Sequence, residues 1–260
     1  MIKILKYTLF DLLRSRWTYS YLVFYLVLSA ALLFLSGDVA KVVISLLNVI
    51  LILCPLIATM FGTMYYYNSR EFIELLLAQP IRRRDIFWGQ YLGVAVSLSL
   101  SLLLGIGIPF TIYGIFNSNE IWHFFNLILN GVLLSFIFSG LSFLIALRNE
   151  NKIKGFGLAI LVWLFFAVIY DGLLLLLLMI FRDYPLETAS LGMSLFNPID
   201  LSRIIILLEL DISALMGYTG AVFQQFLGSS LGIITAFSAL ILWILVPMWG
   251  IRRIAIRKDF

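Results

Sequence analysis

The charged side chains best placed to bind another molecule gather in residues 68–90, between two long apolar stretches. Two acids three residues apart share a helical face, an X-Pro pair ends that helix, and three arginines follow the proline. The predicted contact residues are Glu71, Glu74, Gln79, Pro80, Arg82, Arg83 and Arg84. A short helix, a turn and a basic collar at a membrane surface suit the docking of a soluble partner. The arginines can also orient the chain against anionic headgroups, and the two roles are compatible.

Patterns that would indicate catalysis or metal binding are missing from the sequence. There is no G-x-x-x-x-G-K-[ST] loop for binding phosphates. The sequence has a single histidine, His123, which argues against a zinc site built on histidines and against a Ser-His-Asp triad. His123 follows Trp122 and is predicted to anchor the helix end at the membrane–water interface. Met60, Met64 and Cys54 could in principle bind copper(I), but sulfur side chains on an apolar helix indicate packing. We therefore predict no catalytic residue and no metal ligand.

Asp171 is the one acid expected inside an apolar span. An acid is costly to leave facing lipid, so its side chain should face the bundle, a partner or water. It could line a transport pathway, with help from Tyr170, or make a structural hydrogen bond near the outer boundary of the span. The sequence leaves both interpretations open.

These residues are positioned by a chain that is 62% hydrophobic and only 12% charged, far from the composition of a soluble domain. Six stretches reach or approach the roughly 20 residues that cross hydrocarbon. The predicted fold is therefore an all-α integral membrane protein, with one transmembrane domain over residues 1–260. Its six predicted spans cover about 17–37, 41–66, 90–116, 121–147, 155–181 and 231–250.

Three further segments lie outside these spans. Residues 2–16 are predicted to form an amphipathic helix in the membrane interface. Its apolar face holds Ile2, Leu5, Leu9, Leu12 and Leu13, and its polar face holds Lys3, Lys6, Tyr7 and Arg14. Residues 148–154 form a second inner loop and a candidate minor contact for a partner. The outer segment 183–230 should hold short helices that cap the bundle. One of these starts at Asn197, Pro198 and Asp200, a predicted contact region for an extracytoplasmic partner.

The basic residues also predict the topology. Of 18 Lys and Arg, all but Lys41, Arg182 and Arg203 lie in the segments assigned to the inner side. This positive-inside asymmetry places both termini in the cytoplasm and argues against a nucleic-acid partner. No cleavable signal is evident, and the single cysteine excludes an intrachain disulfide.

The residue pattern of the central segment resembles that of a known protein family. Arg70-Glu71, then Glu74-Leu-Leu-Leu-Ala-Gln-Pro-Ile81, the arginine cluster and Gly89 resemble the coupling segment of ABC-2 type transporter permeases, most of all those of the NosDFY type. The resemblance implies an inner-membrane, homodimeric permease with residues 68–89 as its coupling segment. It implies a separate cytoplasmic ATPase that binds ATP and Mg, and no cofactor in this chain. The NosDFY type further implies a NosD-like periplasmic partner and copper-site assembly in nitrous oxide reductase.

Other functions stay open. Within the same family, the cargo could be a lipid, a polysaccharide or a small molecule. An intramembrane protease or transferase would need several polar groups on facing spans, and Asp171 alone makes a poor dyad. An ion-coupled carrier would need paired buried charges and broken helices in matching halves.

Overall fold

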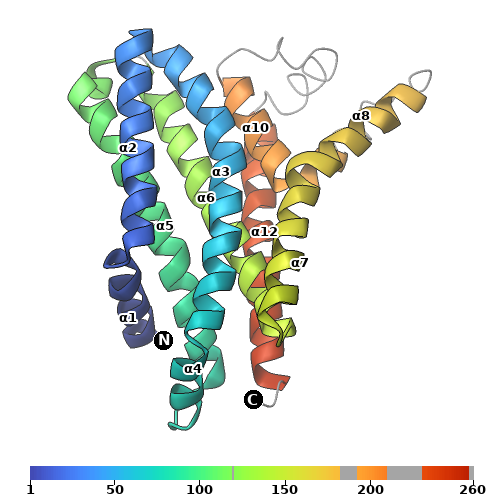
Figure 1. The fold of residues 1–260 in the computed structure, drawn as a ribbon. Helices are drawn as coiled ribbons and strands as arrows, with labels where there is room; N and C mark the ends of the chain where they lie inside the picture. Colours follow the sequence, from blue (N-terminus) through green and yellow to red (C-terminus); the bar gives the residue numbers. More distant parts are fainter. Residues whose placement is uncertain (119, 182–191, 210–229, 258–260) are drawn as a thin grey trace.

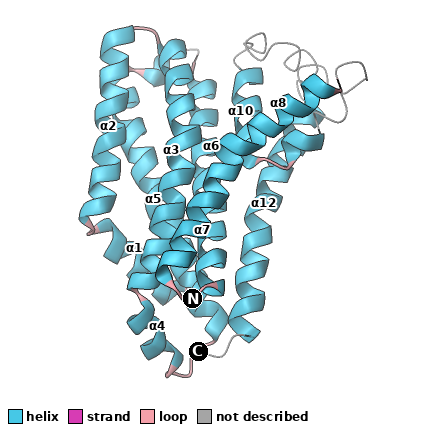
Figure 2. Ribbon diagram, turned by 45° about the vertical axis from the view of Figure 1, so that its right-hand side comes forward, coloured by secondary structure: helices cyan, strands magenta, loops and turns pink. Residues whose placement is uncertain are grey.

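The computed structural model describes residues 1–118, 120–181, 192–209 and 230–257, and the regular elements in these ranges are all helices (Figures 1 and 2). Six of these helices are long and apolar enough to cross a membrane. The prediction of an all-α integral membrane protein is therefore confirmed. The spans are α2 (Arg16–Ser36), α3 (Val39–Asn68), α5 (Arg83–Tyr113), α6 (Ile121–Arg148), a fifth running over Lys152–Leu177, and a sixth over Gly232–Ile256.

Shorter elements connect or flank the spans. Helix α1 precedes the first span, α4 lies between the second and third, and α10 precedes the sixth. Both termini and α4 lie at the same end of the bundle, here called the termini end (Figure 1). These elements are α1 (Ile2–Leu13), α4 (Arg70–Leu77), η1 (Ile115–Asn117) and α10 (Pro198–Glu209), while α12 (Ser230–Arg257) carries the sixth span.

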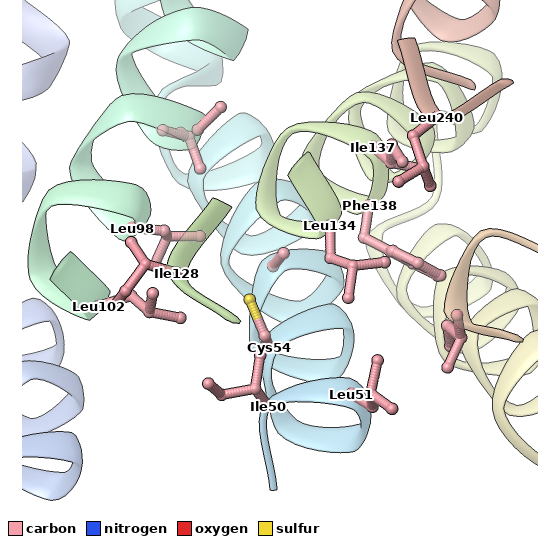
Figure 3. Close-up of a cluster of buried hydrophobic side chains, with 14 of the residues drawn as sticks. Ile50, Leu51, Cys54, Leu98, Leu102, Ile128, Leu134, Ile137, Phe138 and Leu240 are labelled. Carbon is pink, nitrogen blue, oxygen red and sulfur yellow. The ribbon is translucent and has the colours of Figure 1, made fainter. Parts of the chain in front are cut away.

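The centre of the bundle is made by α3, α5 and α6, which are each more than half buried over their most apolar stretch. Small residues let these helices approach closely. A Cβ on Gly62 of α3 would collide with Ser142 of α6, and one on Gly131 of α6 would press on Leu102 and Ile50 at 3.2–3.3 Å. Side chains of these three helices and of α12 interlock around the buried Cys54 (Figure 3).

The link between the first two spans is set by two adjacent residues. Gly37 ends α2 in the left-handed conformation, at φ 62°, where a residue without Cβ is favoured. Asp38 then caps α3, because its Oδ1 accepts the backbone N–H of Ala40 at 3.0 Å. This pair makes a tight reversal at the end of the bundle opposite the termini.

The fifth span differs from its predicted form. The sequence predicts one span over 155–181, whereas the chain forms α7 (Lys152–Leu164), a π turn η2 (Phe165–Ile169) and α8 (Tyr170–Ile180). At the π turn the helix bends, and α8 leans away from the bundle (Figures 1 and 2). No proline or glycine marks the bend in this sequence, so residue patterns gave no warning of it.

Helix α1 packs on α5. Of the predicted apolar residues it buries Leu12 and leaves Leu5, Leu9 and Leu13 half-buried. Its buried residues are Ile4, Thr8 and Leu12, whereas Ile2 is 76% exposed. The contact depends on two glycines of α5, because a Cβ on Gly89 would lie 2.9 Å from the Ile4 side chain and one on Gly93 only 2.5 Å from that of Thr8. The predicted position in the membrane interface stays a prediction.

The described part of the segment 183–230 is residues 192–209, and the other residues of that segment, Gly217, Gly220 and Gly228 among them, lie outside the described residues. Helix α10 contacts α3, α6, α12 and η2. Its residues Ile199, Leu201 and Ile204 are at most 2% exposed. The helix is thus inserted among the spans and does not simply cover their ends.

The α1–α5 contact gives a first prediction. Gly93→Ala should destabilise the protein by about 1–3 kcal/mol, because the added methyl overlaps Thr8 and must push α1 outward. Gly107→Ala in the same helix meets nothing within 4 Å and should be neutral or slightly stabilising. Thermal unfolding in detergent, with limited proteolysis of α1, checks both. Equal unfolding temperatures for the two variants would contradict this account of the contact.

Candidate coupling surface and charge cluster

The predicted contact residues form a helical hairpin that projects from the termini end of the bundle (Figure 1). Helix α4 follows α3 after a single residue, Ser69, and the chain then turns through 78–82 into α5. Pro80 sits in this turn, where its missing N–H costs no helical hydrogen bond. Arg82 is in extended geometry and precedes the first turn of α5.

Helix α4 is held to the bundle by its apolar face. Ile73 and Leu76 are buried, at 2% and 9% exposure. The ring of Phe72 stacks on that of Tyr7 in α1, with centroids 4.8 Å apart. An eight-residue helix is too short to be stable alone in water, so this packing is what fixes its position.

The opposite face of the hairpin is exposed. It presents the two predicted acids and most of the predicted turn and collar, together with Leu75, whose side chain is 67% exposed. Glu74 also pairs with Arg70 at 3.2 Å, one helical turn away. The exposed predicted residues are Glu71, Glu74, Gln79, Pro80, Arg82 and Arg83, and Arg84 is half-buried. All seven predicted residues therefore lie on the projecting hairpin, and six of them are exposed.

The arginine collar continues onto another helix. Arg82, Arg83 and Arg84 line a hollow of about 370 Å³ together with Arg252 of α12, which is far away in the sequence. Arg84 lies 3.6 Å from Asp85 and over the ring of Trp88, at 5.8 Å from its centroid. The basic surface is thus wider than the sequence segment that predicted it.

The root of the hairpin holds residues that the sequence did not single out. Buried Gln90 of α5 donates from Nε2 to Ser69 Oγ at 3.4 Å, and so connects α5 to the joint between α3 and α4. Tyr67 donates its hydroxyl to the carbonyl of Asn149 at 2.8 Å, which ties the second predicted contact loop to the same joint. Gln90 is a polar residue at the start of the predicted third span, and its buried position follows only from the fold.

Asp171 takes part in a charge cluster at the bend of the fifth span. Nη1 of Arg203 in α10 donates to Asp171 Oδ2 at 2.9 Å and to Asp200 Oδ1 at 3.0 Å. The side chains of all three are less than one-third exposed. One guanidinium therefore serves two carboxylates in mostly apolar surroundings, an arrangement expected for charges at membrane depth. The sequence named Asp171 and Asp200 separately, and Arg203 was interpreted only as a topology signal.

Asn197 joins this cluster to the π turn. Its Nδ2 donates to the carbonyl of Phe166 at 2.9 Å and lies 3.4 Å from Asp171 Oδ1, while its Oδ1 accepts the N–H of Ile199. Tyr170 donates to the carbonyl of Met193 at 2.6 Å. The start of α10 is thus bound to the bend of the fifth span by hydrogen bonds. Asn197 is fully buried here, and its predicted contact with an extracytoplasmic partner stays a prediction, as do those of Pro198 and Asp200.

The surroundings of Asp200 also affect its protonation. Burial raises the pKa of Asp200, and the Asp171 carboxylate and its hydrogen bond raise it further, to about 7. Arg203 and Asn197 act in the opposite direction and do not cancel the rise. A raised pKa of this size keeps the Asp200 carboxyl protonated in mildly acidic solution.

The remaining sequence-predicted residues lie apart from both sites. Cys54 is buried between α3 and α6, where its Sγ lies 3.2 Å from the carbonyl oxygen of Gly131 and 3.0 Å from Ser135 Oγ. Met60 and Met64 are partly exposed on α3. His123 Nε2 lies 3.6 Å from Glu120 Oε2 at the end opposite the termini.

Six spans, with a projecting hairpin between the second and the third, define a multi-pass membrane protein. The comparisons with known proteins make this class more specific. The chain is 25% identical to the probable ABC transporter permease protein NosY of Stutzerimonas stutzeri, over 92% of this chain and 89% of the relative. It is 26% identical to the protein of the same name from Pseudomonas aeruginosa, over 92% and 90%. No protein-family model matches the chain.

These two matches confirm the resemblance to ABC transporter permeases of the NosY kind. They support a membrane permease subunit of an ABC transporter, which works with an ATPase subunit. They agree with a non-catalytic role for this chain.

The charge cluster gives a second prediction, which concerns the pH dependence of stability. The pKa of Asp200 decides whether stability rises or falls with pH. Its raised pKa means that the folded chain holds a proton between about pH 4 and 7 that the unfolded chain releases, so stability should fall as the pH rises through this range. Asp200→Asn cannot ionise and should flatten this dependence, raising the unfolding temperature at pH 8 relative to wild type by a few degrees. About 1 kcal/mol corresponds to about 2–4 °C in a chain of this size.

Thermal unfolding at pH 5, 6, 7 and 8 checks this prediction. Asp38→Asn is the matched control, because asparagine caps a helix as well as aspartate does and Asp38 lies outside the cluster. An Asp200→Asn profile parallel to that of the wild type would show that Asp200 does not carry the pH dependence.

Proposed function

We propose that this chain is the permease subunit of an ABC-2 type transporter, in which a separate cytoplasmic ATPase docks on the α4–α5 hairpin. The observation that carries the proposal is the projecting surface of Glu71, Glu74 and the arginine collar at the termini end. The likeness to two probable ABC permeases over 92% of the chain supports it. On this proposal the termini end faces the cytoplasm, as the distribution of basic residues predicts.

The hairpin is suited to transmit movement as well as to bind. Helix α4 joins α3 through one residue, and α5 joins α4 through a short turn, so a displaced hairpin must move the ends of two central spans. Buried Gln90 bridges from α5 to the joint at Ser69. Aromatic rings of Tyr66, Phe87 and Phe143 pack beneath it at centroid distances of 6.2–6.4 Å. A stiff joint of this kind passes force from the ATPase into the bundle.

Two copies of the chain paired with two ATPase subunits make the expected assembly, in the inner membrane. For the output, we propose the NosDFY type: force passed to a NosD-like periplasmic protein during copper-site assembly in nitrous oxide reductase. The name of the two relatives supports this choice. Export of a lipid, polysaccharide or small molecule is the alternative within the class.

One observation favours a second candidate, an ion-coupled carrier. The cluster of Asp171, Asp200 and Arg203 supplies paired charges beside a broken helix, the features expected of such carriers. A carrier would work without an ATPase, and its activity would depend on the cluster and not on the hairpin. The dependence of activity on ATP therefore separates the two candidates.

The proposal predicts that reversing both acids of the hairpin, Glu71→Lys with Glu74→Lys, abolishes association with the ATPase. The helix itself should survive, because the exposed Arg70–Glu74 pair contributes only about 0.3–0.5 kcal/mol. The measurement is the stoichiometry of the nucleotide-binding subunit that co-purifies with tagged chain in mild detergent. Charge reversal at a docking surface should lower this stoichiometry at least tenfold.

Glu120→Lys is the matched control, since Glu120 lies at the opposite end of the bundle and should keep the ATPase bound. Full stoichiometry in the double reversal variant, with the protein inserted and folded, would contradict docking at the hairpin. A periplasmic protein in the wild-type complex would favour the NosDFY type over an exporter.

A further inference from the structure

An elongated groove runs along the termini end of the bundle between α1, α2 and α3. Its apolar part has a volume of about 460 Å³ and is lined by Trp17, Phe24, Ile57, Met60, Phe61 and Met64. Its polar part has about 520 Å³ and is lined by Asp11 and Arg14, among others. Leu12, Ser15, Tyr65 and Asn68 line both parts, so the two hollows adjoin. We call the pair the amphipathic groove.

The position of the groove in the fold indicates what surrounds it. The first span begins at Arg16 and the second ends at Asn68, so the polar part lies where both spans leave the hydrocarbon. Trp17, 65% exposed, marks the same level, as tryptophans do at membrane interfaces. The apolar part extends from this level along α2 and α3, where Met60 and Met64 are also partly exposed. The groove therefore opens sideways into the bilayer, with its polar part at headgroup depth.

The charged side chains of the polar part match a headgroup that carries both a negative and a positive charge. Asp11 lies in the last turn of α1, and Arg14 directly follows that helix in helical geometry, so the two are three residues apart on one face. Among the described residues, neither takes part in an ion pair. A guanidinium binds phosphate by paired hydrogen bonds, and a carboxylate accepts them from a primary ammonium group. These two side chains therefore match a phosphate linked to an amine.

We propose that the amphipathic groove binds a phospholipid with an ethanolamine headgroup, drawn from the leaflet at the termini end. One acyl chain lies between α2 and α3, the phosphate meets Arg14, and the ammonium meets Asp11. A phosphatidylglycerol lacks the amine, and a phosphatidylcholine has no N–H to donate to Asp11. Both should bind more weakly.

The site also adjoins the α4–α5 hairpin. Ser69 and Phe72 line the polar part of the groove, and Phe72 stacks on Tyr7 of α1. A bound headgroup therefore fills the space between α1 and the start of α4 and supports the hairpin in its position. Lipid binding itself does not depend on an ATPase, so it can be tested even if the proposed function fails.

The test uses the purified full-length chain in nanodiscs of phosphatidylcholine that carry a small fraction of a phospholipid with a photoreactive acyl chain. Three probes with the same chain are compared: phosphatidylethanolamine, phosphatidylglycerol and phosphatidylcholine. After irradiation, mass spectrometry locates the labelled peptides. We expect labels on the segments 17–24 and 57–64, and about tenfold stronger labelling with the ethanolamine probe, since each charge-assisted hydrogen bond strengthens binding by at least that order.

Matched variants separate the headgroup from the groove. Asp11→Asn should reduce ethanolamine labelling to the level of the choline probe. Arg14→Gln should reduce labelling by all three probes, since each carries the phosphate, whereas Arg16→Gln, two residues from Arg14 and outside the groove, should change neither. Met64→Trp fills the apolar part and should abolish labelling. Val27→Trp on the exposed face of α2, outside the lining, should leave it unchanged.

Three results would overturn the proposal. They are equal labelling by all three headgroups, labelling at other segments that the variants do not change, and occupation of the groove by a second copy. The last would appear as a protein–protein cross-link from a photoreactive residue placed at position 64, with no lipid adduct.

Discussion

Close backbone approach at a few small residues is the constraint on which the rest of this bundle depends. Lipid competes with apolar side chains as a solvent, so spans associate through tight packing and hydrogen bonds more than through hydrophobic burial. Gly62 of α3 leaves room for Ser142 of α6, and Gly105 of α5 faces Tyr25 and the carbonyl of Leu22 in α2 at 2.8–2.9 Å from where a Cβ would lie. Across this second contact Ser29 donates to the carbonyl of Gly105 at 3.2 Å. Each of these contacts includes one of the two helices, α3 and α5, that carry the hairpin.

The sequence predicts the spans well and the helix contacts poorly. Apolar length and the turn residues Gly37 and Asp38 indicate the first boundary almost to the residue, because both act locally. The contact of α1 was predicted only in part, for the opposite reason: amphipathicity favoured a face that includes Ile2 and Leu12, but Gly89 and Gly93 on a distant helix select Ile4 and Thr8 beside Leu12. A contact between two helices depends on both surfaces, and a pattern along one helix records only half of it.

In the candidate sites, too, local features were predictable from the sequence and contacts between distant segments were not. The hairpin was predictable because its charges, its proline and its arginines are consecutive, whereas Arg252 joins the basic surface only through folding. The charge cluster was half predictable. An acid such as Asp171 inside a span predicts a polar or basic partner. The sequence does not show which basic residue lies near it. That residue is Arg203, because α10 is inserted among the spans. The π turn that receives Asn197 left no sequence signal at all.

Helix α3 links the two sites physically. At the termini end it runs into α4, and beyond its middle it packs against α7, α6 and α10, with Trp163 donating to the carbonyl of Ile52 at 3.2 Å. Tightly packed elements shift between discrete arrangements and do not deform smoothly. On the proposed function, a pull on the hairpin therefore reaches the base of α10 and the Asp171–Arg203 pair. The bend of the fifth span, held there by Asn197, is the element best placed to change when that pull arrives.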